Sequence, residues 1–184
     1  TIPMERDFGT LKRLRGTPMS PASYFIGKAI LVLFSMAVQV LLLMGAGVAF
    51  FGLHMPTTTA KWINFFLFLV IGTICATALG IAFSAIPKSG RGASAVVSPI
   101  VIILQFFSGV FFIFTQLPEW MQGFAAIFPL KWLTQAMRSV FLPDSFITKE
   151  AAGSWEYGRS LIILLVWTVL GIALSIKKFK WVNK

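Results

Sequence analysis

This sequence has few of the residues that usually build catalytic and metal-binding sites. Its 184 residues include one cysteine, Cys75, and one histidine, His54. A single cysteine excludes an internal disulfide and a Cys-rich metal site. A lone histidine without an acidic or Cys neighbour provides neither a metal site nor an oriented base. We therefore expect Cys75 to be a small packing residue and His54 to be an exposed loop residue.

Acidic residues are also scarce. The chain has 6 Asp and Glu, and none lies in its long apolar stretches, which disfavours a proton relay, an ion-coupled carrier or a membrane enzyme with paired acids. A nucleotide-binding loop is missing too, because Gly27-Lys28 is followed by Ala29 and preceded, five residues earlier, by Ala22. The sequence thus predicts a chain that is not an enzyme, with no catalytic and no metal-binding residue.

The chain is rich in long apolar stretches. Hydrophobic residues make up 57% of it, more than a soluble protein of this size could bury. Since about 20 apolar residues cross a bilayer, we predict an all-α integral membrane protein. Four stretches contain no Lys, Arg, Asp or Glu, at residues 29–60, 62–87, 92–118 and 160–176. They place transmembrane helices at 27–51, 62–86, 93–114 and 160–176.

The basic residues predict how these spans are oriented. If all four cross, most of the 16 Lys and Arg share one side of the membrane: Arg6, Lys12, Arg13, Arg15, Lys28, Lys88, Arg91, Lys177, Lys178, Lys180 and Lys184. The other side holds Lys61, Lys131, Arg138, Lys149 and Arg159. By the positive-inside rule, both ends of the chain are cytoplasmic. The net charge of +10 then reflects topology and attraction to anionic lipids, and its dispersal argues against nucleic-acid binding.

Small residues recur at four-residue spacing in the first two predicted spans. They are Gly45 and Ala49 in the first, and Gly72, Ala76 and Gly80 in the second. Such spacing lets helix backbones approach closely. Gly and Ala are also common in membrane helices, so close packing and ordinary composition both remain open.

The first unusual segment precedes the first span. Residues 1–26 are polar and basic, and a Gly16-Thr17-Pro18 turn interrupts a helical run. Leu11 and Leu14 share one face of that run. The segment is therefore expected to lie at the membrane surface or to dock on a cytoplasmic partner.

The second unusual segment is residues 115–158, on the predicted outer side. It is too apolar for an ordinary polar loop, and Pro118 and Pro129 divide it into two short helices. Each helix is too short to cross the bilayer. We expect both to lie at the outer interface or to re-enter the membrane partly.

Both unusual segments resemble one known family, the type-2 ABC transporter permeases. The first carries Glu5-Arg-Asp-Phe-Gly-Thr-Leu-Lys-Arg-Leu-Arg-Gly-Thr-Pro-Met-Ser, then Tyr24 and Gly27-Lys28 just before a span. It is similar to the family's cytoplasmic segment, in which an acidic residue precedes Gly-Thr-Leu, a basic stretch and a Thr-Pro turn. The later runs are similar to the fifth span and the outer helices behind it: Phe106-Phe107-Ser-Gly-Val-Phe-Phe, Leu117-Pro-Glu-Trp-Met-Gln, Phe128-Pro-Leu and Ala136-Met-Arg138.

The resemblance implies a permease with six spans per subunit, of which this chain is the later portion, spans three to six. Residues 1–26 would be its coupling segment, which rests in a groove of a cytoplasmic nucleotide-binding ATPase. A surface-lying basic helix without a partner is the alternative. The contacts implied for the ATPase are Glu5, Gly9, Thr10, Leu11 and Leu14.

The same resemblance gives the outer segment (residues 115–158) a role. Its short helices would cap the translocation path, with Trp120, Trp132 and Arg138 as the cap residues. Arg138 would be held at the lipid head groups or by a carboxylate such as Asp144.

The function so implied is the membrane-spanning permease of an ATP-driven ABC exporter in the bacterial cytoplasmic membrane, surrounded by its lipids. It would move a hydrophobic or lipid-linked substrate or drug. ATP and Mg would bind to the partner ATPase, and a second permease copy would complete a homo- or heterodimer. The alternative from another class is a non-transporting membrane scaffold or accessory subunit. Coupling separates the two, because a permease must change the ATPase rate of its partner.

Overall fold

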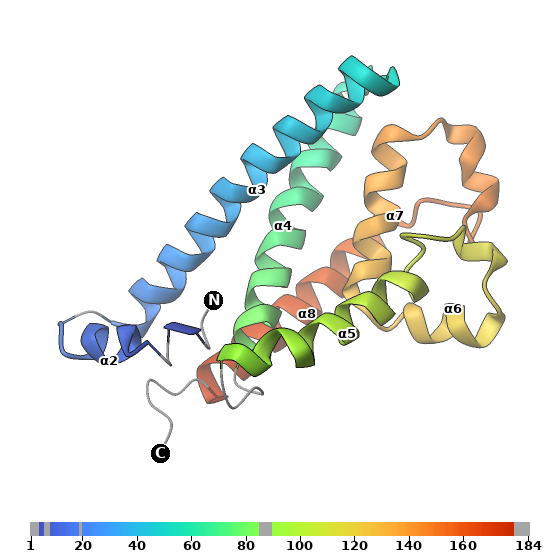
Figure 1. Ribbon diagram of the computed structural model, residues 1–184. Coiled ribbons are helices and arrows are strands. Elements are labelled where there is room, and N and C mark those ends of the chain that lie inside the picture. Colours follow the sequence, from blue (N-terminus) through green and yellow to red (C-terminus); the bar gives the residue numbers. More distant parts are fainter. Residues whose placement is uncertain (1–3, 6–7, 19, 85–89, 179–184) are drawn as a thin grey trace.

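The computed structural model describes residues 4–5, 8–18, 20–84 and 90–178. In this part of the chain every regular element is a helix (Figure 1). The elements are α2 (Thr10–Arg15), α3 (Pro21–Phe51), α4 (Thr59–Phe83), α5 (Gly90–Phe107), η1 (Phe114–Gln116), α6 (Glu119–Ala125), α7 (Pro129–Phe141), η2 (Asp144–Lys149) and α8 (Tyr157–Lys178).

Three of these helices are long and apolar enough to cross a membrane. They run over Ala22–Phe51, Thr59–Phe83 and Tyr157–Lys177, in agreement with three of the four predicted spans. The chain is therefore a multi-pass membrane protein.

The remaining predicted span, 93–114, differs from the structure at its end. α5 stops at Phe107, and its apolar part, Ala95–Phe107, is shorter than the three candidate spans. Gly109 then adopts a left-handed φ of 74°, which turns the chain and ends the helix before residue 114. A fourth crossing at this segment stays a prediction.

α3 begins and ends at residues suited to helix termini. The Ser20 side chain accepts a hydrogen bond from the Ser23 backbone N–H at 3.2 Å, and Pro21 occupies the first turn. At the other end Gly52 caps the helix with a left-handed φ of 62°. The first span is thus part of a helix that starts ahead of its predicted boundary at residue 27.

The core forms around α4, which packs against α3, α7 and α8. Its centre holds the buried residues Phe68, Cys75, Ala136 and Leu164. Burial of Cys75 among apolar side chains confirms its predicted packing role. His54, by contrast, is exposed in the connection between α3 and α4, as expected.

The close approach of α4 and α8 occurs at a glycine that the spacing pattern did not mark. A Cβ added to Gly171 would lie 3.0 Å from the Ala78 Cβ. Just beyond it, the Ser175 hydroxyl donates to the Ala78 carbonyl at 3.0 Å. Gly45 and Gly80 have open space where a Cβ would be. Gly72 differs, because a Cβ there would lie 2.6 Å from the Leu133 side chain of α7. Of these three glycines, close packing is therefore found at Gly72 and not at Gly45 or Gly80 within this chain.

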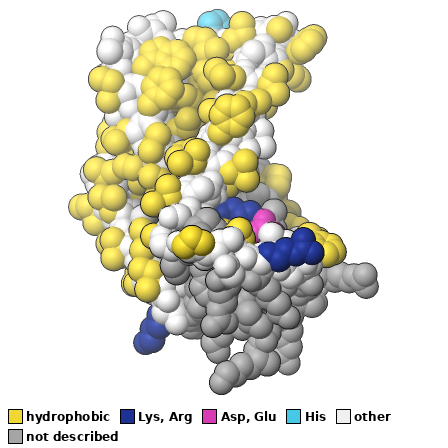
Figure 2. Space-filling view, turned by 90° about the vertical axis from the view of Figure 1, so that its left-hand side faces the viewer, with side chains coloured by type: hydrophobic (Ala, Val, Ile, Leu, Met, Phe, Trp, Pro, Cys, Tyr) yellow, Lys and Arg dark blue, Asp and Glu magenta, His cyan; other side chains and the backbone are white. Residues whose placement is uncertain are grey.

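α3 is the least covered of the long helices. In its most apolar window 6% of the residues are buried, against 44% for α4. Figure 2 shows this side of the molecule, where apolar side chains cover the upper and middle parts and Lys and Arg appear only towards the lower end. A surface of this kind fits contact with lipid or with apolar protein.

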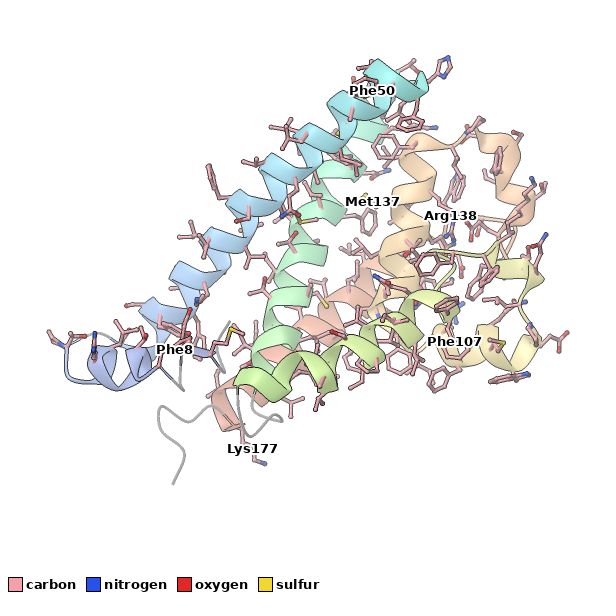
Figure 3. The ribbon with its side chains drawn as sticks, viewed as in Figure 1. Phe8, Phe50, Phe107, Met137, Arg138 and Lys177 are labelled. Atoms are coloured by element: carbon pink, nitrogen blue, oxygen red, sulfur yellow. The ribbon has the colours of Figure 1, made fainter. Side chains whose placement is uncertain are left out.

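The two ends of the bundle carry different segments. α2 lies at the lower end in Figure 1, and the labelled Phe8 and Lys177 lie at that end in Figure 3, opposite Phe50. The coupling segment and the end of α8 thus share one end of the molecule. Their placement in the cytoplasm stays a prediction from charge.

Candidate functional site

The coupling segment has a tight turn at its centre. The Phe8 backbone N–H donates to the Met4 carbonyl at 2.9 Å. Gly9 then adopts a left-handed φ of 73°, which residues with a Cβ rarely do, and α2 follows. At the end of α2 the Thr17 hydroxyl donates to the Leu14 carbonyl at 2.6 Å. Gly9 is therefore the corner of the part of this segment that the structure describes.

The structure does not place the five residues predicted to contact an ATPase on one open face. Thr10 is exposed, Gly9 forms the corner and Leu14 is half-buried. The Leu11 side chain lies outside the described residues. Glu5 is turned towards α3, where the Tyr24 hydroxyl and the Lys28 ammonium both donate to its carboxylate. Whether these residues contact an ATPase stays a prediction.

Phe8 is the residue at this end that the sequence reasoning missed. Its side chain is 80% exposed although it is a large aromatic, and it stands immediately before the Gly9 corner. The sequence analysis placed the contact on Glu5, Gly9, Thr10 and the two leucines that share a helical face, and did not single out Phe8. An aromatic residue next to a turn glycine in a polar segment was the available signal.

Arg138 in α7 ties together three parts of the outer region. Its Nε and Nη2 donate to the two carboxylate oxygens of Glu150 at 2.7 and 3.1 Å, and its Nη1 donates to the Gly109 carbonyl at 3.1 Å. The Glu150 side chain is only 4% exposed. This two-pronged geometry is the strongest that arginine makes with a carboxylate.

The structure pairs Arg138 with Glu150 and not with Asp144, the carboxylate that the sequence analysis suggested. Asp144 is 75% exposed and lies 3.9 Å from Lys61. Residues 144–149 form the short helix η2, which brings Glu150 back towards α7. Of the two alternatives, lipid head groups or a carboxylate such as Asp144, the structure thus shows a carboxylate, that of Glu150. The role of Arg138 in a cap stays a prediction.

Lys131, about two helical turns before Arg138, is buried in a pocket of polar and aromatic side chains. Its ammonium donates to the Gln135 side chain at 2.5 Å, lies 3.9 Å from Glu156 and sits 3.6 Å from the centre of the Trp132 ring. Burial lowers the pKa of Lys131 to about 8, although Glu156 and Glu150 attract its charge. The polar side of α7 thus faces the protein interior.

The stretch that enters α8 is strained where it meets this pocket. Glu156 has a φ of 44°, the one positive value of a non-glycine residue in the described part of the chain. Such a conformation costs about 1–3 kcal/mol and persists where surrounding contacts fix it. Its carboxylate accepts from Arg159 at 3.0 Å and faces Lys131. These charges hold the entry to α8 in place.

The two tryptophans predicted in the cap occupy different environments. Trp132 is buried, and its indole N–H donates to the Ala126 carbonyl at 2.7 Å. Trp120 is exposed on α6, with its ring edge against Phe107 at a centroid distance of 6.4 Å. Trp132 therefore fixes α7 to the turn before it, while Trp120 lies on the surface beside the end of α5.

This arrangement holds helices in place rather than assembling reactive groups. Among the residues that the structure describes, no group of three or more His, Cys, Asp or Glu could hold a metal ion. The charges of the outer segment are instead used in pairs that join α5, α7 and the lead into α8.

Comparison with known proteins identifies the family. The family model described as ABC-2 type transporter matches residues 2–142. The chain belongs to the ABC-2 type transporter family. It is thus a membrane component of an ABC transporter, a permease. No curated protein and no solved structure gave a match. The matched part of this ABC-2 permease includes the coupling segment and α7, and ends before Glu150 and α8.

Proposed function

We propose that this chain is the membrane-spanning permease of an ATP-driven exporter, coupled through residues 1–26 to a nucleotide-binding ATPase that binds ATP and Mg. The observation that supports it best is the exposed Phe8 on a fixed turn at one end of the bundle (Figure 3). Burying such a side chain in an apolar groove of a partner is worth about 1.5–3 kcal/mol. Aromatic residues of this kind are typical anchors of interfaces.

The proposed cargo is a lipid-linked or other hydrophobic molecule, or a drug. A shallow depression of about 510 Å³ lies along one side of α4 and is lined by apolar residues that include Trp62, Phe66 and Val70. Surfaces of this composition accept apolar molecules from the bilayer. The family resemblance implies export, a bacterial cytoplasmic membrane and a second permease copy that completes the path. The distribution of basic residues predicts cytoplasmic ends.

The test uses the full natural polypeptide in lipid nanodiscs together with its cognate ATPase. ATP hydrolysis is measured as the permease is titrated with the ATPase. We expect stimulation by the wild type. Loss of an aromatic anchor costs about 2 kcal/mol or more, so Phe8→Ala should raise the half-saturating ATPase concentration at least about tenfold.

Phe50→Ala provides the matched control. Phe50 is 81% exposed, almost as much as Phe8, but lies at the opposite end of α3 (Figure 3). Its replacement should leave the titration unchanged. An ATPase that neither binds the wild type nor responds to it would favour the scaffold or accessory subunit and overturn the proposal.

A further inference from the structure

Glu5 connects the coupling segment to the base of α3. The Tyr24 hydroxyl donates to the Glu5 Oε2 at 2.7 Å, and the Lys28 ammonium donates to Oε1. Lys28 also lies 5.8 Å from the centre of the Tyr24 ring. Both oxygens of one carboxylate are thus occupied by groups of α3.

The environment keeps this carboxylate ionised. Burial by itself raises the pKa of Glu5, but the hydrogen bonds from Lys28 and Tyr24 and the charge of Lys28 outweigh it and lower the pKa. The side chains of Lys28 and Glu5 are only 19% and 26% exposed. A pair shielded in this way is screened less by salt than one on an open surface.

The connection matters because the backbone alone would leave a hinge. The coupling segment reaches α3 through the turn at Gly16, Thr17 and Pro18, which provides one point of attachment. Glu5, which precedes α2 in the sequence, adds a second point of attachment. Two attachments prevent the segment from pivoting about its turn, so a push on Phe8 moves α3 with it.

α3 is also the helix that such a push can shift. Among the described elements it packs mainly on α4, and few residues of its apolar window are buried. Small displacements of packed helices are a common way to convert a local contact into a larger change.

Resting on the proposed function, we propose that Glu5, Tyr24 and Lys28 form a clamp that fixes the coupling segment to α3. Glu5 is then a positioning residue for coupling and not a contact with the ATPase. This assigns to Glu5 a role different from the one its sequence motif suggested.

The test uses Glu5→Lys, Lys28→Glu and the double variant with both changes, again in the full polypeptide with its cognate ATPase in nanodiscs. Each single change places like charges together, while the double change restores an opposite pair. We expect each single variant to lower the maximal stimulation of ATP hydrolysis at least about tenfold, because hydrogen bonds to charged groups are strong. The half-saturating ATPase concentration should stay the same, and the double variant should recover most of the stimulation.

A second readout needs no ATPase. Trypsin cleaves after Lys and Arg, and the coupling segment contains Lys12, Arg13 and Arg15. When the clamp is open, the segment should separate from α3 and become accessible to trypsin. Cleavage at these positions should therefore be about tenfold faster in both single variants. In the double variant it should be near the wild-type rate. Lys177→Gln, at the same end of the molecule (Figure 3), should leave both readouts unchanged.

The outcomes separate the clamp from the proposed function. A higher half-saturating concentration in Glu5→Lys, without recovery in the double variant, would mean that Glu5 contacts the ATPase directly and would overturn the clamp. Unchanged cleavage in both single variants would overturn it as well. If the wild type fails to stimulate the ATPase, the proposed function fails, while the cleavage rates still decide whether the clamp exists.

Discussion

Removal of the Glu150 charge should strongly destabilise the packing of α7 against its neighbours. Glu150→Gln leaves the Arg138 guanidinium in place but removes the negative charge that pairs with it. Removing one partner of a buried ion pair costs about 3–5 kcal/mol. Since Arg138 is 22% exposed and Glu150 only 4%, water can recover part of the arginine's hydration, and we expect the lower end, about 3 kcal/mol.

The assay is thermal unfolding of the full permease in nanodiscs. For chains of about 150–250 residues, each kcal/mol shifts the midpoint by about 2–4 °C, so the midpoint should fall by about 6–12 °C. Asp144→Asn is the matched control, because Asp144 is 75% exposed and 3.9 Å from its basic neighbour. Its midpoint should change by less than about 4 °C, as exposed pairs contribute about 0–1 kcal/mol.

A double change tests the reasoning itself. If the cost of Glu150→Gln comes from an unpaired arginine, then Arg138→Gln together with Glu150→Gln should be less destabilising than the sum of the two single changes. Simple additivity, or an Asp144→Asn variant as unstable as Glu150→Gln, would refute the assignment of Glu150 as the partner of Arg138.

Two further predictions concern burial. The pKa of Lys131 is about 8 in the folded chain, below the usual value of about 10.4 that applies when it is unfolded. Burial of the charged Lys131 therefore destabilises the fold at neutral pH, and this cost is relieved as the pH rises from about 8 to about 10.4. Wild-type stability relative to Lys131→Met should then increase by up to about 3 kcal/mol between pH 7 and 10.5. A difference in unfolding midpoint that does not change with pH would contradict this. Gly171→Ile should force α4 and α8 apart and lower the midpoint by several degrees, whereas Gly80→Ile, with open space around it, should not; equal effects would argue against the tight contact at Ala78.

The sequence predicts the three long membrane helices well, because a run without charge is a property that local composition determines. It does not predict where α5 ends. Residues 110–114 are as apolar as the helix before them, and only the left-handed Gly109 separates the two. Hydropathy indicates whether a segment is apolar, but it does not indicate where its helix ends and the backbone turns.

Partners across the fold were harder to predict than the residues that need them. The resemblance implied lipid head groups or a carboxylate such as Asp144 for Arg138, but Glu150 becomes adjacent only because η2 turns the chain back. In the same way, spacing identified small residues without identifying the face that meets α8, so Gly171 was missed. The coupling role of residues 1–26 stays a prediction from the resemblance, and the inward turn of Glu5 depends on contacts with α3 that no local pattern encodes.

The charges of α7 have a consequence for how this protein can be cut or recombined. Lys131 and Arg138 lie before residue 142, where the family match ends, and their carboxylates, Glu156 and Glu150, lie after it. The end of the match is therefore not a boundary of the folded unit. A chimaera joined at residue 142 would exchange both carboxylates while keeping Lys131 and Arg138. Residues 109–159 should be exchanged between homologues as one piece, so that Lys131 and Arg138 keep their own carboxylates.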